Sequence, residues 1–110
     1  MDCKDPSAAG ACIMHHVAIQ TADFRRALWF YTELLGLPVV KPPFKFNNKR
    51  TLAWLDAGGV LIELYSVKEG LQPEPYCDRR LGADHIAFVF ADLEPILDKL
   101  ARNGFTILKG

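Results

Sequence analysis

The sequence predicts an α+β domain in which a strand–helix–strand–strand–strand module is followed by a second, incomplete copy of itself. Half of the 110 residues are apolar, as expected for a folded domain with one core. A segment near the N-terminus is repeated late in the chain, and in both places strand-like alternation gives way to helical spacing. These observations together predict the duplicated α+β architecture.

The repeat is detected at an offset of 69 residues. Residues 16–19 (HVAI) align with residues 85–88 (HIAF), Ala22 and Asp23 align with Ala91 and Asp92, and Leu28 aligns with Leu97. Gly36 then meets Gly104 after a slip of one residue. Five identities in the same strand-then-helix context favour a duplication over chance.

The first module is expected to start with a strand over residues 13–20, which are rich in β-branched side chains. Asp23 is the expected N-cap of the following helix, because its short carboxylate accepts from the free amides of the first turn. Apolar residues then recur at helical spacing up to Leu35, and Gly36 is placed to end the helix.

Three further strands are expected in the first module: residues 37–40, with a possible resumption near Phe44, then residues 51–57 and 60–67. Residues 57–59 (AGG) form a tight hairpin between the last two. The intervening residues 41–50 are expected to be a surface loop, with a mobile flap as the alternative.

The second module is expected to begin after a polar, proline-bearing linker over residues 68–83. It has a strand over residues 85–90, an N-cap at Asp92 and a helix ending near Asn103 and Gly104. The predicted organisation is therefore a loose tail over residues 1–12 and one domain over residues 13–110, with module one at 13–67 and partial module two at 84–110.

Composition excludes several classes of function. Lysine plus arginine equals aspartate plus glutamate at 13 each, and no basic stripe is present, which argues against nucleic acid as a partner. No apolar run approaches the roughly 20 residues that cross a bilayer, and the N-terminus lacks the apolar region of a signal peptide. Three cysteines without a zinc or redox spacing favour free thiols and a cytoplasmic location.

Three polar side chains in the predicted strands are candidate metal ligands. Alternation places His16 on the face opposite His15, and His85 occupies the repeat-equivalent position of His16. Glu63 lies inside an apolar β-rich run, where an uncompensated charge would be costly. Two imidazoles and one carboxylate suit a divalent cation such as zinc, nickel, manganese or iron, and they leave positions open for substrate.

Each of these residues also has a simpler interpretation. A single strand histidine is most often a hydrogen-bonded core or edge residue, which is the interpretation we adopt for His15. Glu63 could be an exposed edge glutamate or the partner of an arginine. Trp54, Phe44 and Phe46 are candidate substrate-contacting residues, although each could equally belong to the core or to a surface loop.

These motifs resemble the vicinal-oxygen-chelate superfamily, which includes glyoxalases, bleomycin resistance proteins and extradiol dioxygenases. The resemblance is carried by residues 16–19, 22–23, 30–31 and 34–37, by residues 62–64 (IEL) and by residues 84–88 (DHIAF), and it spans about residues 13–108. It implies two βαβββ modules whose mixed sheets curl around a metal cup, in a homodimer. It also implies that His16, Glu63 and His85 are the first three metal ligands.

A carboxylate at the second ligand position is closest to glyoxalase I. The resemblance therefore implies a divalent-metal-dependent lyase or isomerase that acts on a small vicinal-oxygen compound such as a hemithioacetal, with Glu63 as the catalytic proton carrier. The sequence departs from the family because the last two strands of module two, and the fourth ligand, a glutamate, are missing. We expect the resulting unpaired sheet edge to favour a dimer.

Two other functions remain open. One is a metal-free protein that binds and sequesters a small molecule, as bleomycin resistance proteins do. The other is a shortened, non-catalytic family member that persists as an oligomerisation domain. The metal-free binding protein differs from the enzyme in containing no metal. The non-catalytic family member differs from both because no small molecule should stabilise it against thermal unfolding.

Overall fold

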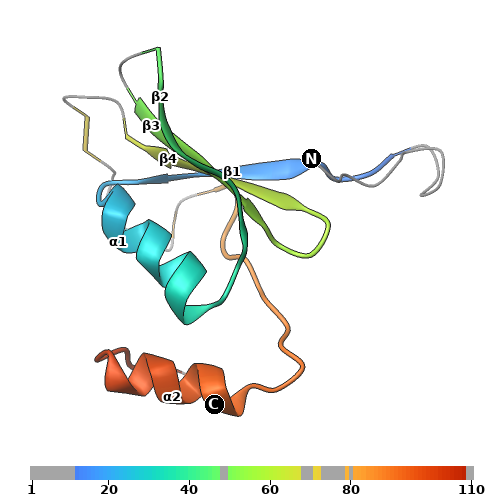
Figure 1. Cartoon of the computed structure of the whole chain (residues 1–110), viewed down its shortest axis with the longest axis vertical. Helices are drawn as coiled ribbons and strands as arrows, with labels where there is room; N and C mark the ends of the chain where they lie inside the picture. Colours follow the sequence, from blue (N-terminus) through green and yellow to red (C-terminus); the bar gives the residue numbers. More distant parts are fainter. Residues whose placement is uncertain (1–11, 48–49, 68–70, 73–78, 80, 109–110) are drawn as a thin grey trace. The chain divides into compact units, whose positions relative to one another are not determined.

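The computed structural model describes residues 12–47, 50–67, 71–72, 79 and 81–108 (Figure 1). Almost all of the predicted N-terminal tail lies outside the described residues, as does most of the predicted linker. The chain forms two compact units, Met1–Pro73 and Glu74–Gly110. No helix within the described ranges has the length and apolar character needed to cross a membrane.

The first unit is built on a four-stranded mixed sheet. Its strands are β1 (His16–Thr21), β2 (Val39–Phe46), β3 (Arg50–Asp56) and β4 (Leu61–Ser66), in the spatial order β1-β4-β3-β2. β1 runs parallel to β4, and the other two pairs are antiparallel. With the helices described below, this curled sheet confirms the predicted α+β class.

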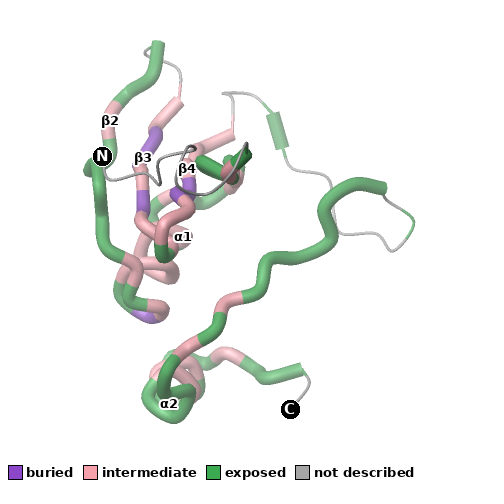
Figure 2. Tube along the Cα trace, turned by 90° about the vertical axis from the view of Figure 1, so that its right-hand side faces the viewer, coloured by how far each residue is buried: buried purple, intermediate pink, exposed green. Residues whose placement is uncertain are grey.

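One face of the sheet forms the core beneath the helix. Ala53 and Leu55 of β3 and Leu64 of β4 are fully buried, and Ile62 is 2 % exposed. These residues alternate along their strands with the partly exposed Trp54 and Glu63, so the two faces differ in character. Burial is concentrated in β3 and β4, the two central strands (Figure 2).

The helix of the first unit begins where the sequence predicts. Asp23 is the N-cap of α1 (Phe24–Trp29), and its Oδ1 accepts a 3.1 Å hydrogen bond from the Arg26 amide. The helix then widens into a π-helical segment, η1 (Phe30–Leu34), in which the Leu35 amide donates to the Phe30 carbonyl at 3.0 Å. Gly36 follows with a φ of 80°, a left-handed conformation that confirms its predicted role as helix stop.

The prediction of a loop is wrong for residues 41–46, because β2 continues to Phe46, and the resumption of the strand near Phe44 is confirmed. Residues 48–49 lie outside the described residues. Two register shifts against β3, between Val39 and Lys41 and between Lys41 and Phe44, accommodate the strand across Pro42 and Pro43. β2 is an edge strand, where a proline that lacks an amide donor is tolerated.

The tight turn between β3 and β4 agrees with the sequence. Gly58 and Gly59 have positive φ angles of 83° and 101°. Both of their amides donate to Oδ1 of Asp56, at 2.9 Å and 3.1 Å. The carboxylate therefore fixes the turn that sets the register of the two central strands.

The second unit contains one described helix, α2 (Glu94–Arg102), followed by Gly104 with a φ of 81°. Its N-cap is Leu93 rather than the predicted Asp92, although Asp92 accepts a 3.2 Å hydrogen bond from the Glu94 amide. The predicted strand over residues 85–90 is also wrong, because no strand is assigned to this segment. A strand exists only when a second strand pairs with it, and the described part of this unit offers none.

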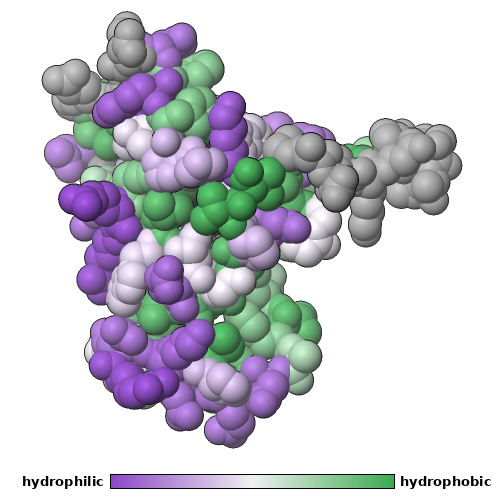
Figure 3. Space-filling model, in the orientation of Figure 1, coloured by the Kyte–Doolittle hydropathy of each residue, from purple (hydrophilic) through white to green (hydrophobic). Residues whose placement is uncertain are grey.

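On the face seen in Figure 3, hydrophobic and hydrophilic side chains lie next to one another, and hydrophilic ones predominate at the bottom of the view.

Candidate functional site

The face of the sheet opposite the helix carries the first two candidate ligands. Ala18 of β1, Glu63 of β4 and Trp54 of β3 are register partners, so they form one row across three strands. His16 lies two residues before Ala18 and therefore shares this face. We call this surface the open face, and it is defined by His16, Glu63, Trp54 and their register neighbours.

His16 is held between two aromatic rings. Its imidazole meets the Trp54 indole edge-on, with ring centroids 5.0 Å apart, and this contact spans β4 because β4 lies between β1 and β3. Its Nδ1 lies 2.7 Å from Nδ1 of His15, so one ring donates and the other accepts. This arrangement leaves Nε2 of His16 as the nitrogen with which it could bind a ligand.

The expected position of His15 requires a correction. Alternation predicts that it points away from His16, yet the two rings make the hydrogen bond described above. β1 begins only at His16, so His15 precedes the pleated part of the strand and is not bound by its alternation.

Glu63 is half-buried and belongs to a polar cluster on the open face. A hydrogen bond from the Tyr65 side chain to Glu63 is the main reason why the pKa of Tyr65 is raised above its ordinary value of 10.0. Burial and the Glu63 charge raise this pKa further, whereas the Arg50 charge lowers it. The Arg50 guanidinium lies over the Tyr65 ring at 4.5 Å and donates to the Gln20 side chain at 2.9 Å.

The candidate substrate-contacting aromatics lie on the same face. Phe44 pairs with Leu52 and Phe46 pairs with Arg50, and both partners alternate in phase with Trp54 along β3. Phe44 is half-buried beneath the Lys41 ammonium, which lies 4.3 Å from the ring centroid, and Phe46 is 46 % exposed. Because these rings belong to a strand, their pairing with β3 puts them on the face that bears Glu63. A loop, as expected from the sequence, would not have fixed their direction.

His85 lies in the second unit, where its side chain is 77 % exposed. Its Nδ1 lies 2.8 Å from Oδ2 of Asp84. A carboxylate on Nδ1 fixes the ring tautomer and leaves Nε2 as the free lone pair, the arrangement common among metal-binding histidines. Asp84 therefore leaves Nε2 as the nitrogen through which His85 could contact a ligand.

Two of the three predicted ligands, His16 and Glu63, share the open face, and their donor types fit a divalent cation. Throughout the described ranges, however, no group of three histidine, cysteine, aspartate or glutamate side chains is gathered closely enough to hold a metal ion. The first unit supplies only His16 and Glu63 of the predicted ligands, because His85 belongs to the second unit.

Three residues of the open face were not predicted from the sequence: Tyr65, Gln20 and Arg50. The signal that would have found the first two was present, since Tyr65 lies two residues after Glu63 and Gln20 lies four residues after His16. Residues an even number of positions apart in a strand point to the same face, so Tyr65 shares the face of Glu63 and Gln20 shares the face of His16. Arg50 was missed because the predicted strand begins at residue 51, whereas β3 begins at Arg50, in phase with Trp54.

The fold and this face define an α+β protein with an open sheet surface that combines imidazole, carboxylate and aromatic side chains. The family model described as "Glyoxalase/Bleomycin resistance protein/Dioxygenase superfamily" matches residues 13–110. The chain therefore belongs to this superfamily, which confirms the resemblance found in its motifs. A search of curated proteins found no relative.

Several solved structures share the fold. The crystal structure of SMU.1112c has a TM-score of 0.69 at 24% identity, covering 86% of this chain and 77% of that protein. The trypanothione-dependent glyoxalase I of Leishmania major has a TM-score of 0.66 at 24% identity, covering 84% of this chain and 66% of the enzyme. Lactoylglutathione lyase from Agrobacterium tumefaciens has a TM-score of 0.53 at 19% identity, covering 91% of this chain and 75% of that enzyme. At these identities the likeness extends to the fold alone.

Proposed function

We propose that this protein is a divalent-metal-dependent lyase or isomerase of the glyoxalase type, acting on a small vicinal-oxygen compound such as a hemithioacetal. The observation that carries the proposal is the register of β1 and β4, which puts His16 and Glu63 on one face beside Trp54. In this proposal His85 is the third ligand, and the metal is zinc, nickel, manganese or iron. The substrate class follows the two glyoxalase-type enzymes among the similar structures.

A bound divalent ion would act as a Lewis acid that polarises two adjacent substrate oxygens and acidifies the neighbouring C–H bond. The protein contributes positioning and proton transfer. Glu63 accepts the proton from carbon and returns it to the adjacent carbon, and the Tyr65 hydroxyl holds the carboxylate in place. Trp54, Phe44 and Phe46 line the face, and they exclude water from the reacting atoms.

Metal content tests the ligand assignment directly. Purified protein is expected to retain near-stoichiometric zinc, nickel, manganese or iron by elemental analysis, and His16→Ala and His85→Ala to lose it. Glu63→Gln should weaken retention, whereas the matched control Glu94→Gln, an exposed glutamate at the start of α2, should not. Retention of the metal in His85→Ala would contradict the three-ligand site.

The corresponding catalytic experiment measures formation of lactoylglutathione from its hemithioacetal by the metal-loaded protein. Glu63→Gln should lower kcat at least 100-fold, because general acid–base catalysis contributes roughly 100- to 10,000-fold. Wild-type protein that holds metal yet does not convert the hemithioacetal would contradict the substrate class and leave the metal site intact.

A metal-free binding protein is the second candidate, and one observation favours it: three aromatic side chains share the open face. The open face would then bind an aromatic compound through Trp54, Phe44 and Phe46. Phe46→Ser should weaken binding of such a ligand by about 5-fold or more, since an aromatic contact of this kind is worth ~1 kcal/mol or above. Lys45→Ser is the control, because Lys45 pairs with Thr51 and lies on the other face.

Two further expectations belong to this proposal: a homodimer and a cytoplasmic location. The location rests on the free thiols predicted from the sequence, of which Cys12 is described as free and exposed.

A further inference from the structure

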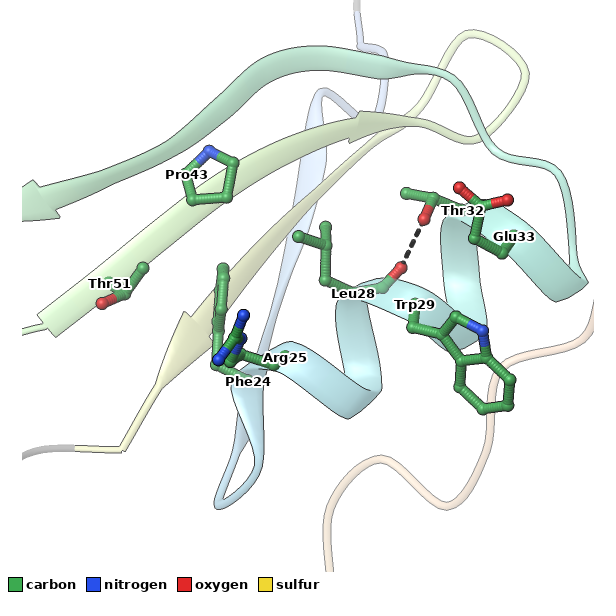
Figure 4. A pocket seen from close by; sticks show the side chains of 8 residues that line it. All are labelled: Phe24, Arg25, Leu28, Trp29, Thr32, Glu33, Pro43 and Thr51. Atoms are coloured by element: carbon green, nitrogen blue, oxygen red, sulfur yellow. Dashed lines mark hydrogen bonds between the residues drawn. The ribbon is translucent and has the colours of Figure 1, made fainter.

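A groove lies on the helix side of the sheet, opposite the open face, and has a volume of about 550 Å³. That volume is within the range of small-molecule sites. Its walls come from α1 and η1 on one side and from β2 and β3 on the other (Figure 4). The lining residues are Phe24, Arg25, Leu28, Trp29, Thr32, Glu33, Pro43 and Thr51.

Thr51 establishes that this groove is distinct from the proposed active site. It directly precedes Leu52 in β3 and therefore points to the face that the helix covers, away from Trp54 and Glu63. Every lining residue belongs to the first compact unit. The groove is thus a property of that unit alone.

The groove combines an apolar wall with one unpaired positive charge. Phe24, Leu28 and Pro43 offer hydrocarbon surface. The Thr32 hydroxyl donates to the Leu28 carbonyl at 2.7 Å, and Glu33 already has an interaction partner. The exposed Arg25 guanidinium, by contrast, makes no hydrogen bond or ion pair with any part of the chain that the structure describes. The charge available to a ligand is therefore positive.

The backbone of the groove is also unusual. Thr32 and Glu33 lie in η1, the π-helical segment closed by the hydrogen bond from Leu35 to Phe30. The π-helix is rare, and it appears mostly as single turns inside α-helices, frequently at functional sites. Here the widened turn carries two of the lining residues.

We propose that this groove is a second ligand site, which binds a small molecule with an apolar, aromatic-sized body and one carboxylate. The body lies against Phe24, Leu28 and Pro43, and the carboxylate binds Arg25. A planar guanidinium presents paired N–H donors that match the two oxygens of a carboxylate, which is why the ligand is a carboxylate rather than a cation or a neutral compound.

The experiment uses 1-naphthoate as the probe and the full chain labelled with ¹⁵N. Titration should shift the amide signals of residues 24–33 and Thr51 in a saturable way and leave those of His16 and Glu63 unchanged. Neutral 1-naphthamide should bind more weakly, since it lacks the charge that Arg25 recognises. Arg25→Gln should weaken 1-naphthoate at least 10-fold, because hydrogen bonds between charged groups are about twice as strong as neutral ones.

Two variants act as controls. Arg102→Gln removes an exposed arginine of α2, outside the groove, and should leave 1-naphthoate affinity unchanged. Pro43→Trp fills the groove from the edge strand and should abolish binding, with the circular dichroism spectrum confirming that the variant folds.

Four results with the probe would overturn the proposal. They are unchanged affinity in Arg25→Gln, equal binding of 1-naphthamide, signal changes centred on the open face, and no saturable binding at millimolar probe. Concentration-dependent shifts of the groove signals in the absence of probe would likewise overturn it, because a second copy of the chain would then be the occupant. Since the groove does not include His16, Glu63 or His85, its test is independent of metal content.

Discussion

At the scale of single residues, the chemistry of this protein depends on which side chains a neighbour holds in place. His16 has Nδ1 bonded to His15, and His85 has Nδ1 beside Asp84. In both rings Nε2 is thereby left for a ligand, although the partner of Nδ1 is an imidazole in one case and a carboxylate in the other. The sequence motifs identify the two histidines as candidate ligands, but their hydrogen bonds decide which ring nitrogen can bind a metal.

Tyr31 gives a prediction about alkaline pH. Burial raises the pKa of its hydroxyl above 10.0, because the phenolate is poorly solvated inside the protein. The folded state thus holds the proton more tightly than the unfolded state. The stabilisation is fully present below pH 10, and it is lost as the pH rises through the folded-state pKa.

Tyr31→Phe keeps the ring and removes the ionisable group. Its thermal midpoint should therefore fall less steeply than that of the wild type between about pH 10 and 12. Both proteins share the same lysines, so the difference between the two curves isolates Tyr31. Parallel curves would show that the phenolate is not disfavoured in the folded state.

At the scale of elements, local signals fix the ends of helices and turns more firmly than the middles of strands. Asp23, Gly36 and the pair Gly58 and Gly59 are all where the sequence places them. β2 and η1 differ from the prediction, since the first crosses two prolines by register shifts and the second widens an expected α-helix. The course of β2 depends on its pairing with β3, which no local signal specifies.

Asp23→Ala tests the N-cap of α1. Loss of the hydrogen bond to the Arg26 amide should cost about 1 kcal/mol and lower the thermal midpoint by roughly 4–8 °C for a unit of this size. Hydrogen exchange at the Arg26 amide should accelerate, because its partner is gone.

The repeat supplies the matched control, Asp92→Ala. Asp92 aligns with Asp23 but is not the N-cap of α2, so its loss should cost less than that of Asp23. Equal destabilisation of the two variants would mean that Asp92 caps its helix in solution.

At the scale of the whole molecule, the two edges of the sheet are protected unequally. The edge strand β2 carries Lys41, Lys45 and two prolines, which discourage pairing with another chain. The other edge strand, β1, has the sequence HVAIQT and carries none of these features. The asymmetry favours β1 as the edge through which two copies would pair.

Ala18→Pro tests this expectation by removing one amide from the outer edge. Leu61 and Val67 donate to the carbonyls of His15 and Thr21, so the odd-numbered residues of β1 bond to β4 and the amide of Ala18 points outward. Light scattering should report a dimer for the wild type and for Ala18→Val, which keeps the amide, and a monomer for Ala18→Pro. A monomeric wild type would refute the dimer.

The sequence by itself determined the α+β class, the family, the N-cap of α1, the glycine turns, and the alternation that sets His16 and Glu63 among apolar neighbours. These features depend on residues close together in the chain, whose conformational preferences are local. Tertiary structure decided the strand order, which aligns Ala18, Glu63 and Trp54 in one row, and it decided that residues 85–90 form no strand in their own unit. The physical reason is that a strand is completed by hydrogen bonds to a distant segment, and no pattern within the strand specifies that partner.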